Sequence, residues 1–191
     1  MTALRRAALA ATLLASTAAA ALTMNGFEIG PDALVPANRI HAGGPPRDGI
    51  PAITAPKFEP GRTSREVAAD EWVLGIAWNG VTKAYPIAIM NYHEIVNDRF
   101  GGEPVIVTFC PLCGSGIAYS ARVDGRVLHF GVSGLLYNSD VLLYDRETGS
   151  LWSQMLSQAV TGPLKGSRLE MLPLVQTPWS AWLAQHPDTL V

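Results

Sequence analysis

The chain contains two cysteines, and both lie in the short segment Cys110-Pro111-Leu112-Cys113. Pro111 fixes φ at one position of a turn, and Gly114 gives the backbone freedom directly after it. Two thiols held this close can close a disulfide, exchange disulfides with another thiol, or bind a soft metal ion. Cys110 and Cys113 are therefore the first candidates for catalytic or metal-binding residues.

A metal centre needs more donors than two thiolates, and the sequence has four histidines to supply them. His93 is the preferred third ligand because it lies in the same compact region as the cysteine pair. A Cys110, Cys113 and His93 site with one open position suits a catalytic zinc, and a further methionine or histidine would suit copper. Glu94 would then orient the imidazole or lie in the outer shell of the site. The expected cofactor is copper or zinc.

Other uses of the cysteine pair remain open. In a thiol-redox protein, Cys110 would attack a disulfide and Cys113 would resolve it, with no cofactor. A thioredoxin fold is disfavoured because residues 114–116 lead into an alternating strand pattern and not into a helix. A deaminase centre is disfavoured because His93 and Glu94 are adjacent. The competing class is a non-catalytic ligand-binding or protein-interaction domain in which the cysteines form a structural disulfide.

A second polar cluster follows the cysteine turn in the sequence. Asn138, Asp140 and Gln154 belong to segments rich in short polar side chains and aromatic residues. We predict that these three side chains face a pocket beside the cysteine turn, together with Glu94. The alternative is that they bond to local backbone in turns, as such residues often do. A hydrolase is disfavoured because the sequence has no Gly-x-Ser-x-Gly elbow.

Several strands must position these residues. Residues 72–78 and 81–86 alternate as strands, and Asn79-Gly80 between them is typical of a type I′ hairpin turn. Residues 104–109 are rich in β-branched side chains, which predicts a strand that is buried on both faces and ends at Cys110. Further strands are expected within 117–123, 126–132, 141–144 and 150–155, and short helices over 87–96 and 178–186. The fold class is therefore α+β and β-rich, with a mainly antiparallel sheet and two or three short helices.

The N-terminal third has a different composition. Residues 1–21 combine Arg5 and Arg6 with a short apolar stretch and small residues, which is typical of a cleavable signal peptide. Residues 22–65 are rich in proline and glycine and form an arm or linker, and residues 66–191 form the compact domain. We expect a periplasmic or secreted protein without a transmembrane span in its mature form. The formal net charge of −2 gives no electrostatic case for nucleic-acid binding, and the partners stay unknown.

Seven motifs in order along the chain carry a resemblance to a known family. They are 84–86 (Ala-Tyr-Pro), 93–98 (His-Glu-Ile-Val-Asn-Asp), 107–114 (Val-Thr-Phe-Cys-Pro-Leu-Cys-Gly), 130–135 (Phe-Gly-Val-Ser-Gly-Leu), 138–140 (Asn-Ser-Asp), 144–146 (Tyr-Asp-Arg) and 150–154 (Ser-Leu-Trp-Ser-Gln). Over about residues 66–191 the chain resembles domain-of-unknown-function family 3179, whose members are prokaryotic and often exported. The resemblance implies kinship but no particular reaction. It marks the His-Glu-Ile-Val-Asn-Asp motif (93–98) and the Cys-Pro-Leu-Cys motif (110–113) as family motifs.

Overall fold

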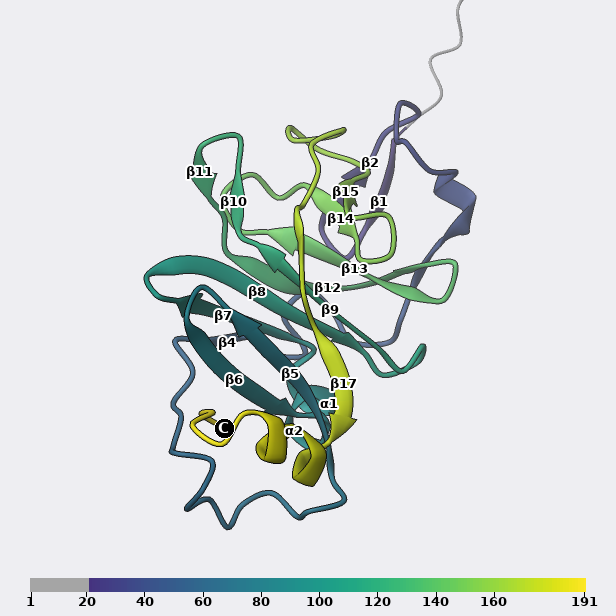
Figure 1. The fold of residues 1–191 in the computed structure, drawn as a ribbon. Coiled ribbons are helices and arrows are strands. Elements are labelled where there is room, and N and C mark those ends of the chain that lie inside the picture. The colour runs from purple at the N-terminus through teal and green to yellow at the C-terminus, as the bar shows by residue number, and fades with distance from the viewer. Residues whose placement is uncertain (1–20) are drawn as a thin grey trace, which may run out of the picture.

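The computed structural model describes residues 21–191, and three β-sheets form its body (Figure 1). The first sheet has the spatial order β15 (Gln158–Ala159), β14 (Leu151–Ser153), β13 (Asp140–Asp145), β12 (Phe130–Tyr137) and β3 (Ile40–Ala42). The second has the order β16 (Met171–Leu172), β9 (Ser115–Ser120), β8 (Glu103–Cys110), β7 (Ile95–Phe100) and β4 (Ile53–Thr54). The third consists of β17 (Val175–Pro178), β5 (Trp72–Trp78) and β6 (Val81–Pro86).

The remaining elements are short. Two small hairpins are formed by β1 (Leu22–Met24) with β2 (Phe27–Ile29) and by β10 (Arg122–Val123) with β11 (Arg126–Val127). The helices are the 3₁₀ turn η1 (Ala37–Arg39), α1 (Ile87–His93) and α2 (Trp179–Gln185). Within residues 21–191 the strands of each sheet pair antiparallel except β4 with β7. The predicted β-rich α+β class with a mainly antiparallel sheet is confirmed.

The three sheets stack on one another, and β8 in the middle sheet contributes to the core on both of its faces. Ile106 and Cys110 belong to the cluster shared with β12, β13 and β14. Val105, Val107 and Phe109 belong to the cluster shared with β5, β6 and α1. This alternation follows from the two-residue period of a strand. It directs the Cys110 side chain towards the β12–β13 sheet.

The β5–β6 hairpin forms where the sequence predicts it, with positive φ at both Asn79 and Gly80. The predicted helix over 87–96 is wrong beyond His93. Glu94 has a φ of +57° and ends α1, and β7 begins at the β-branched Ile95 and pairs with β8 along its length. The backbone therefore changes from helix to strand at Glu94, directly after the histidine that the sequence favoured as a ligand.

Residues of the proline- and glycine-rich arm pack on the body. Strand β3 pairs with β12, and β4 pairs in parallel with β7. Phe27, Ile29 and Ile40 are buried against residues of β12 and β13. The domain limits predicted from the sequence are not tested by this packing and stay a prediction. The signal peptide predicted for residues 1–21 lies, apart from residue 21, outside the described residues.

The C-terminal helix α2 covers the third sheet. Trp179 and Trp182 are buried against Val73 of β5, and Gly75 leaves the space that the indole of Trp182 occupies. In the part of the chain that the structure describes, no helix has the length and apolar character needed to cross a bilayer.

Candidate metal centre

The cysteine turn connects β8 to β9. Cys110 is the last residue of β8 and pairs with Ser115 across the hairpin, so residues 111–114 form the loop. Gly114 takes a φ of +62° and brings the chain back into β9. Cys110 is fully buried, and Cys113 is exposed at the loop; both are free thiols. The hairpin therefore presents one sulfur to solvent and keeps the other in the core.

A second hairpin meets this turn from the neighbouring sheet. Asn138 and Ser139 both have positive φ and form the two-residue turn between β12 and β13. That geometry is the type I′ turn that matches the twist of paired strands. The turn places the Ser139 carbonyl oxygen 3.2 Å from Cys113 Sγ and the Asp140 Oδ1 atom 3.7 Å from the same sulfur. The two hairpin tips thus touch through Cys113.

Three ligand atoms converge at this contact. The sulfurs of Cys110 and Cys113 and a carboxylate oxygen of Asp140 all lie within 4.8 Å of one another. Within residues 21–191, this is the one set of three or more histidine, cysteine, aspartate or glutamate side chains brought close enough to hold an ion. The structure thus puts Asp140, and not His93, beside the two sulfurs.

The environment of this group opposes the ionisation of Cys113 and of Asp140. Desolvation, followed by the neighbouring Cys110 and Asp140 groups, raises the pKa of Cys113 to about 12. Burial also raises the pKa of Asp140, although hydrogen bonds from the Met155 N–H and from the two thiols oppose the shift. Three acidic groups are therefore crowded together, and each ionised member makes ionisation of the next harder.

The other residues predicted for the site lie elsewhere or have other roles. His93 Nδ1 lies 2.7 Å from the Pro51 carbonyl oxygen, so the imidazole is tied to the N-terminal arm. Asn138 is exposed in the hairpin turn. Gln154 is fully buried, and its amide bonds Thr108 of β8 and Ser115 of β9. Gln154 thus braces the strands that carry the cysteine turn and does not face an open pocket.

Glu94 lines a cavity next to the turn. The cavity has a volume of about 260 Å³, and Pro111 and Leu112 of the cysteine loop form part of its wall. Burial raises the pKa of Glu94 to about 7. The sequence predicted a pocket position for this residue, and the structure separates it from the three converging ligand atoms.

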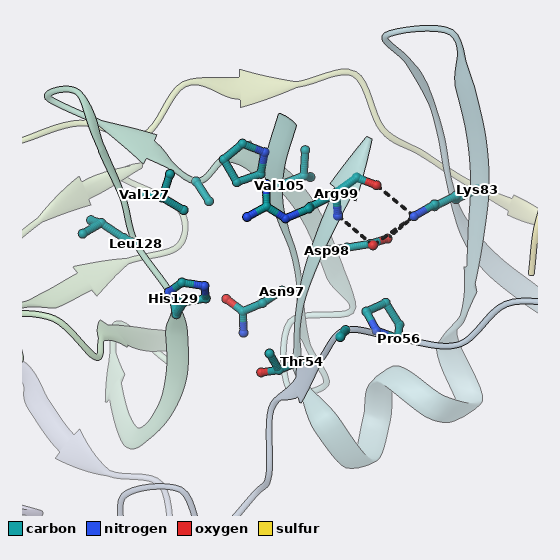
Figure 2. Close-up of a pocket in the computed structure, with 13 residues that line it drawn as sticks. Thr54, Pro56, Lys83, Asn97, Asp98, Arg99, Val105, Val127, Leu128 and His129 are labelled. Carbon is teal, nitrogen blue, oxygen red and sulfur yellow. Dashed lines mark hydrogen bonds and ion pairs between the residues drawn. The ribbon is translucent and has the colours of Figure 1, made fainter. Parts of the chain in front are cut away.

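Sequence reasoning missed a buried polar network beside a second cavity of about 380 Å³. Figure 2 shows Lys83 on one side of this cavity reaching Asp98 and the backbone of Arg99, with His129 on the other side. Lys83 Nζ lies 2.8 Å and 2.9 Å from the two carboxylate oxygens of Asp98 and 2.9 Å from the Arg99 carbonyl. Tyr85 donates a 2.6 Å hydrogen bond to the same carboxylate.

The hydrogen-bonding capacity of Lys83 in this network is fully used. An ammonium has three donors, and all three of Lys83 are used. Burial and the adjacent Asp98 raise the pKa of Tyr85 far above its usual range, so its phenol stays protonated. A locked ion pair of this kind joins β6 to β7 and leaves no free nucleophile or base. We therefore assign it a role in the packing of the sheets and keep the cysteine turn as the candidate site.

The comparisons with known proteins identify a family but no activity. The model of a family described as "Protein of unknown function (DUF3179)" matches residues 47–191. No curated protein and no solved structure matches the chain. The matched segment is well over half of the 191 residues and includes β5 to β17, both α-helices and the cysteine turn. The chain belongs to the DUF3179 family of proteins of unknown function.

Proposed function

We propose that this protein binds one copper or zinc ion through the thiolates of Cys110 and Cys113 and the carboxylate of Asp140. The observation that carries the proposal is the convergence of these three donor atoms within 4.8 Å. Thiolates are the preferred ligands of copper(I) and zinc, and a carboxylate oxygen completes many zinc sites. The donor set therefore favours a soft or borderline ion over calcium or magnesium.

The spacing of the donors supports a tetrahedral ion. Zinc–sulfur and zinc–oxygen bonds of about 2.3 Å and 2.1 Å at a tetrahedral angle separate the two donors by about 3.6 Å. Cys113 Sγ and Asp140 Oδ1 are 3.7 Å apart. This pair can therefore close on an ion with little movement of either hairpin. The Met155 N–H, 3.1 Å from Asp140 Oδ2, holds the carboxylate in place from outside the site.

Three protein ligands leave one position of a tetrahedral ion open. When bound, zinc in such a site acts as a Lewis acid or lowers the pKa of a bound water. The exposed position of Cys113 gives access to this side of the centre from solvent. The arrangement supports a metal centre that a small molecule can reach.

A thiol-redox role receives less support from the same geometry. The sequence assigned the attacking role to Cys110, but that sulfur is fully buried, so an external disulfide meets Cys113 first. A thiol with a pKa of about 12 is almost entirely protonated at neutral pH, and only the thiolate is a nucleophile. A metal ion is smaller than a protein disulfide, and on binding it displaces the thiol protons itself.

We further propose that the protein acts in the periplasm or outside the cell. The signal-like composition of residues 1–21 supports export. In an oxidising compartment a bound ion would also protect the cysteine pair from closing into a disulfide.

Metal analysis of the full-length protein tests the proposal. Wild-type protein reconstituted with zinc or copper(I) and desalted is expected to retain one ion per chain. The Cys110→Ser, Cys113→Ser double variant should retain none, and Asp140→Asn should bind more weakly, by about a hundredfold. Asp70→Asn, at an exposed position, is the matched control and should bind like wild type. Equal, negligible metal in wild type and the double variant would refute the proposal.

The same samples also test the alternative that the two cysteines form a structural disulfide in a non-catalytic domain. If the cysteines serve as a structural clasp, alkylation and mass analysis will find them joined, metal will be absent, and reduction will lower the melting temperature. That outcome would favour a non-catalytic interaction domain.

A further inference from the structure

The cavity beside the cysteine turn is built from several separate parts of the chain. Ile50 and neighbouring residues come from the N-terminal arm, Glu94 from the end of α1, and Leu112 from the cysteine loop. The rest of the wall is formed by Asn91 of α1, by Pro111 and by mostly apolar residues of β12 and β13, including Leu135 and Leu142. The cavity has a volume of about 260 Å³ and is lined mainly by apolar atoms. It is therefore a mainly hydrophobic, partly open space between segments that are distant in the sequence.

Glu94 is the one ionisable side chain in this wall. The residue is 9% exposed, and desolvation alone accounts for its raised pKa. Its carboxylate has no hydrogen bond or ion pair with any residue that the structure describes. Both carboxylate oxygens are within reach of solvent, because no buried side-chain oxygen in the described residues lacks a hydrogen-bond partner. Glu94 is therefore a residue of the cavity wall with an unused hydrogen-bond acceptor.

The backbone at Glu94 strengthens this argument. Its φ of +57° is in the region that favours glycine, and a residue with a side chain is strained there. The conformation is fixed by two backbone hydrogen bonds, from the Glu94 N–H to the Met90 oxygen and from the Phe109 N–H to the Glu94 oxygen. Glycine would satisfy the same turn without strain. The chain instead has an acidic residue at a strained position in the wall of a mainly apolar cavity, a combination that indicates a binding role.

We propose that this cavity binds a small molecule with a compact apolar body and one hydrogen-bond donor group, an amine or a hydroxyl, which Glu94 receives. An apolar cavity of 150 Å³ holds benzene, so 260 Å³ accommodates a monosubstituted benzene ring. The apolar wall binds the body of the ligand, and Glu94 fixes its orientation, as single polar groups do in small-molecule sites. The proposal does not require a metal at the cysteine turn.

Three probes of nearly equal shape separate the contributions. Benzylamine and benzyl alcohol carry a donor, and toluene carries none. Binding is measured by ligand-observed NMR on the full-length protein, in chelator-treated samples, so that the amine cannot be captured by a metal ion. Both donors should bind wild type about tenfold more tightly than toluene, the effect of one hydrogen bond to a charged or strongly polar group.

Substitutions then assign the effect to Glu94. Glu94→Leu should bring benzylamine and benzyl alcohol down to the affinity of toluene. Glu94→Gln keeps the shape and an acceptor oxygen, so it should weaken benzylamine by about tenfold and change benzyl alcohol less. Glu170→Gln, at an exposed position, is the control and should change nothing. Melting curves of all variants show that each is folded, and Glu94→Gln alone suffices if Glu94→Leu does not fold.

Several results would overturn the inference. Equal affinity of wild type for toluene, benzylamine and benzyl alcohol would refute it, and so would Glu94 variants that bind all three probes as wild type does. Binding of benzylamine to metal-loaded protein only would assign it to the cysteine turn instead. The Cys110→Ser, Cys113→Ser double variant separates the two sites, because it should lose metal and keep the donor preference of the cavity.

Discussion

Replacing Glu94 with glutamine is expected to change how the stability of the protein depends on pH. Burial in the cavity raises the pKa of this carboxyl from its ordinary 4.5 to about 7. Between these two values the folded state holds a proton that the unfolded state has lost. The unfolded state thus binds fewer protons, and the free energy of unfolding falls as the pH rises through this window. Below about 4.5 the contribution is fully present, and above about 7 its loss is complete.

The size of the effect follows from the same two values. A pKa difference of one corresponds to 1.36 kcal/mol, so a rise from 4.5 to about 7 makes wild type about 3 kcal/mol less stable at high pH than at low pH through this group. Between pH 5 and pH 8 about 2 to 3 kcal/mol of this change is accessible. Glutamine is neutral throughout, so Glu94→Gln should show no such loss.

Urea unfolding at pH 5, 6, 7 and 8 measures the prediction. The difference in free energy of unfolding between Glu94→Gln and wild type removes the contribution of every other titrating group. That difference should increase steadily with pH in favour of the variant. Glu170→Gln, which is exposed, should give a difference that stays constant. Parallel pH profiles for wild type and Glu94→Gln would show that the carboxyl is not desolvated, and the case for a carboxylate facing an apolar cavity would fail.

Three further predictions address the core, the ion pair and the thiol. Gly75→Ala places a Cβ atom in contact with the ring of Trp182 and should lower the free energy of unfolding by about 1–3 kcal/mol, as measured by urea titration. Asp98→Ala leaves the Lys83 ammonium buried without its counter-ion and should cost about 3–5 kcal/mol, visible as a large drop in melting temperature, whereas an unchanged melting temperature would contradict the buried pair. Metal-free Cys113 should react with iodoacetamide at pH 8 about a hundredfold to a thousandfold more slowly than a cysteine in a peptide, because its pKa is raised from 9.0 to about 12. The reaction rate should rise about tenfold per pH unit. A rapid reaction at pH 7 would reopen the thiol-redox interpretation.

The parts of the fold that the sequence predicted are those whose determinants are local. Asn79-Gly80 forces a hairpin wherever the flanking residues alternate, and β5 and β6 follow from it. The β-branched run before Cys110 gives a strand buried on both faces for a similarly local reason. The helix predicted over 87–96 was wrong from residue 94 because β7 is stabilised by its pairing with β8, which the apolar spacing of the segment does not reveal.

The candidate site likewise has one part that the local sequence predicts and another that depends on the tertiary structure. The approach of Cys110 to Cys113 is encoded by four consecutive residues. The approach of Asp140 depends on two hairpins from different sheets meeting at their tips, a tertiary relation that the sequence does not carry. His93 was favoured because it lies in the same compact region as the cysteine pair, but its ring bonds the carbonyl of Pro51 in the arm. In the sequence, Glu94 was noticeable only because it directly follows His93, which was predicted to be a ligand. Its strained backbone is visible only in the structure.

The charge balance of the cysteine site is the strongest physical reason to expect a cation there. The contacts of Asp140 are backbone N–H groups and the two thiols, and none of them carries a positive charge. Desolvation and the neighbouring Cys110 and Asp140 groups raise the pKa of Cys113 to about 12, and burial raises the pKa of Asp140, so without a cation the site disfavours ionisation of both groups. A disulfide would remove the thiol protons but leave the Asp140 carboxyl buried without a partner for its charge. A bound cation stabilises all three groups in their ionised form at once, so it accounts for the carboxylate as well as for the sulfurs.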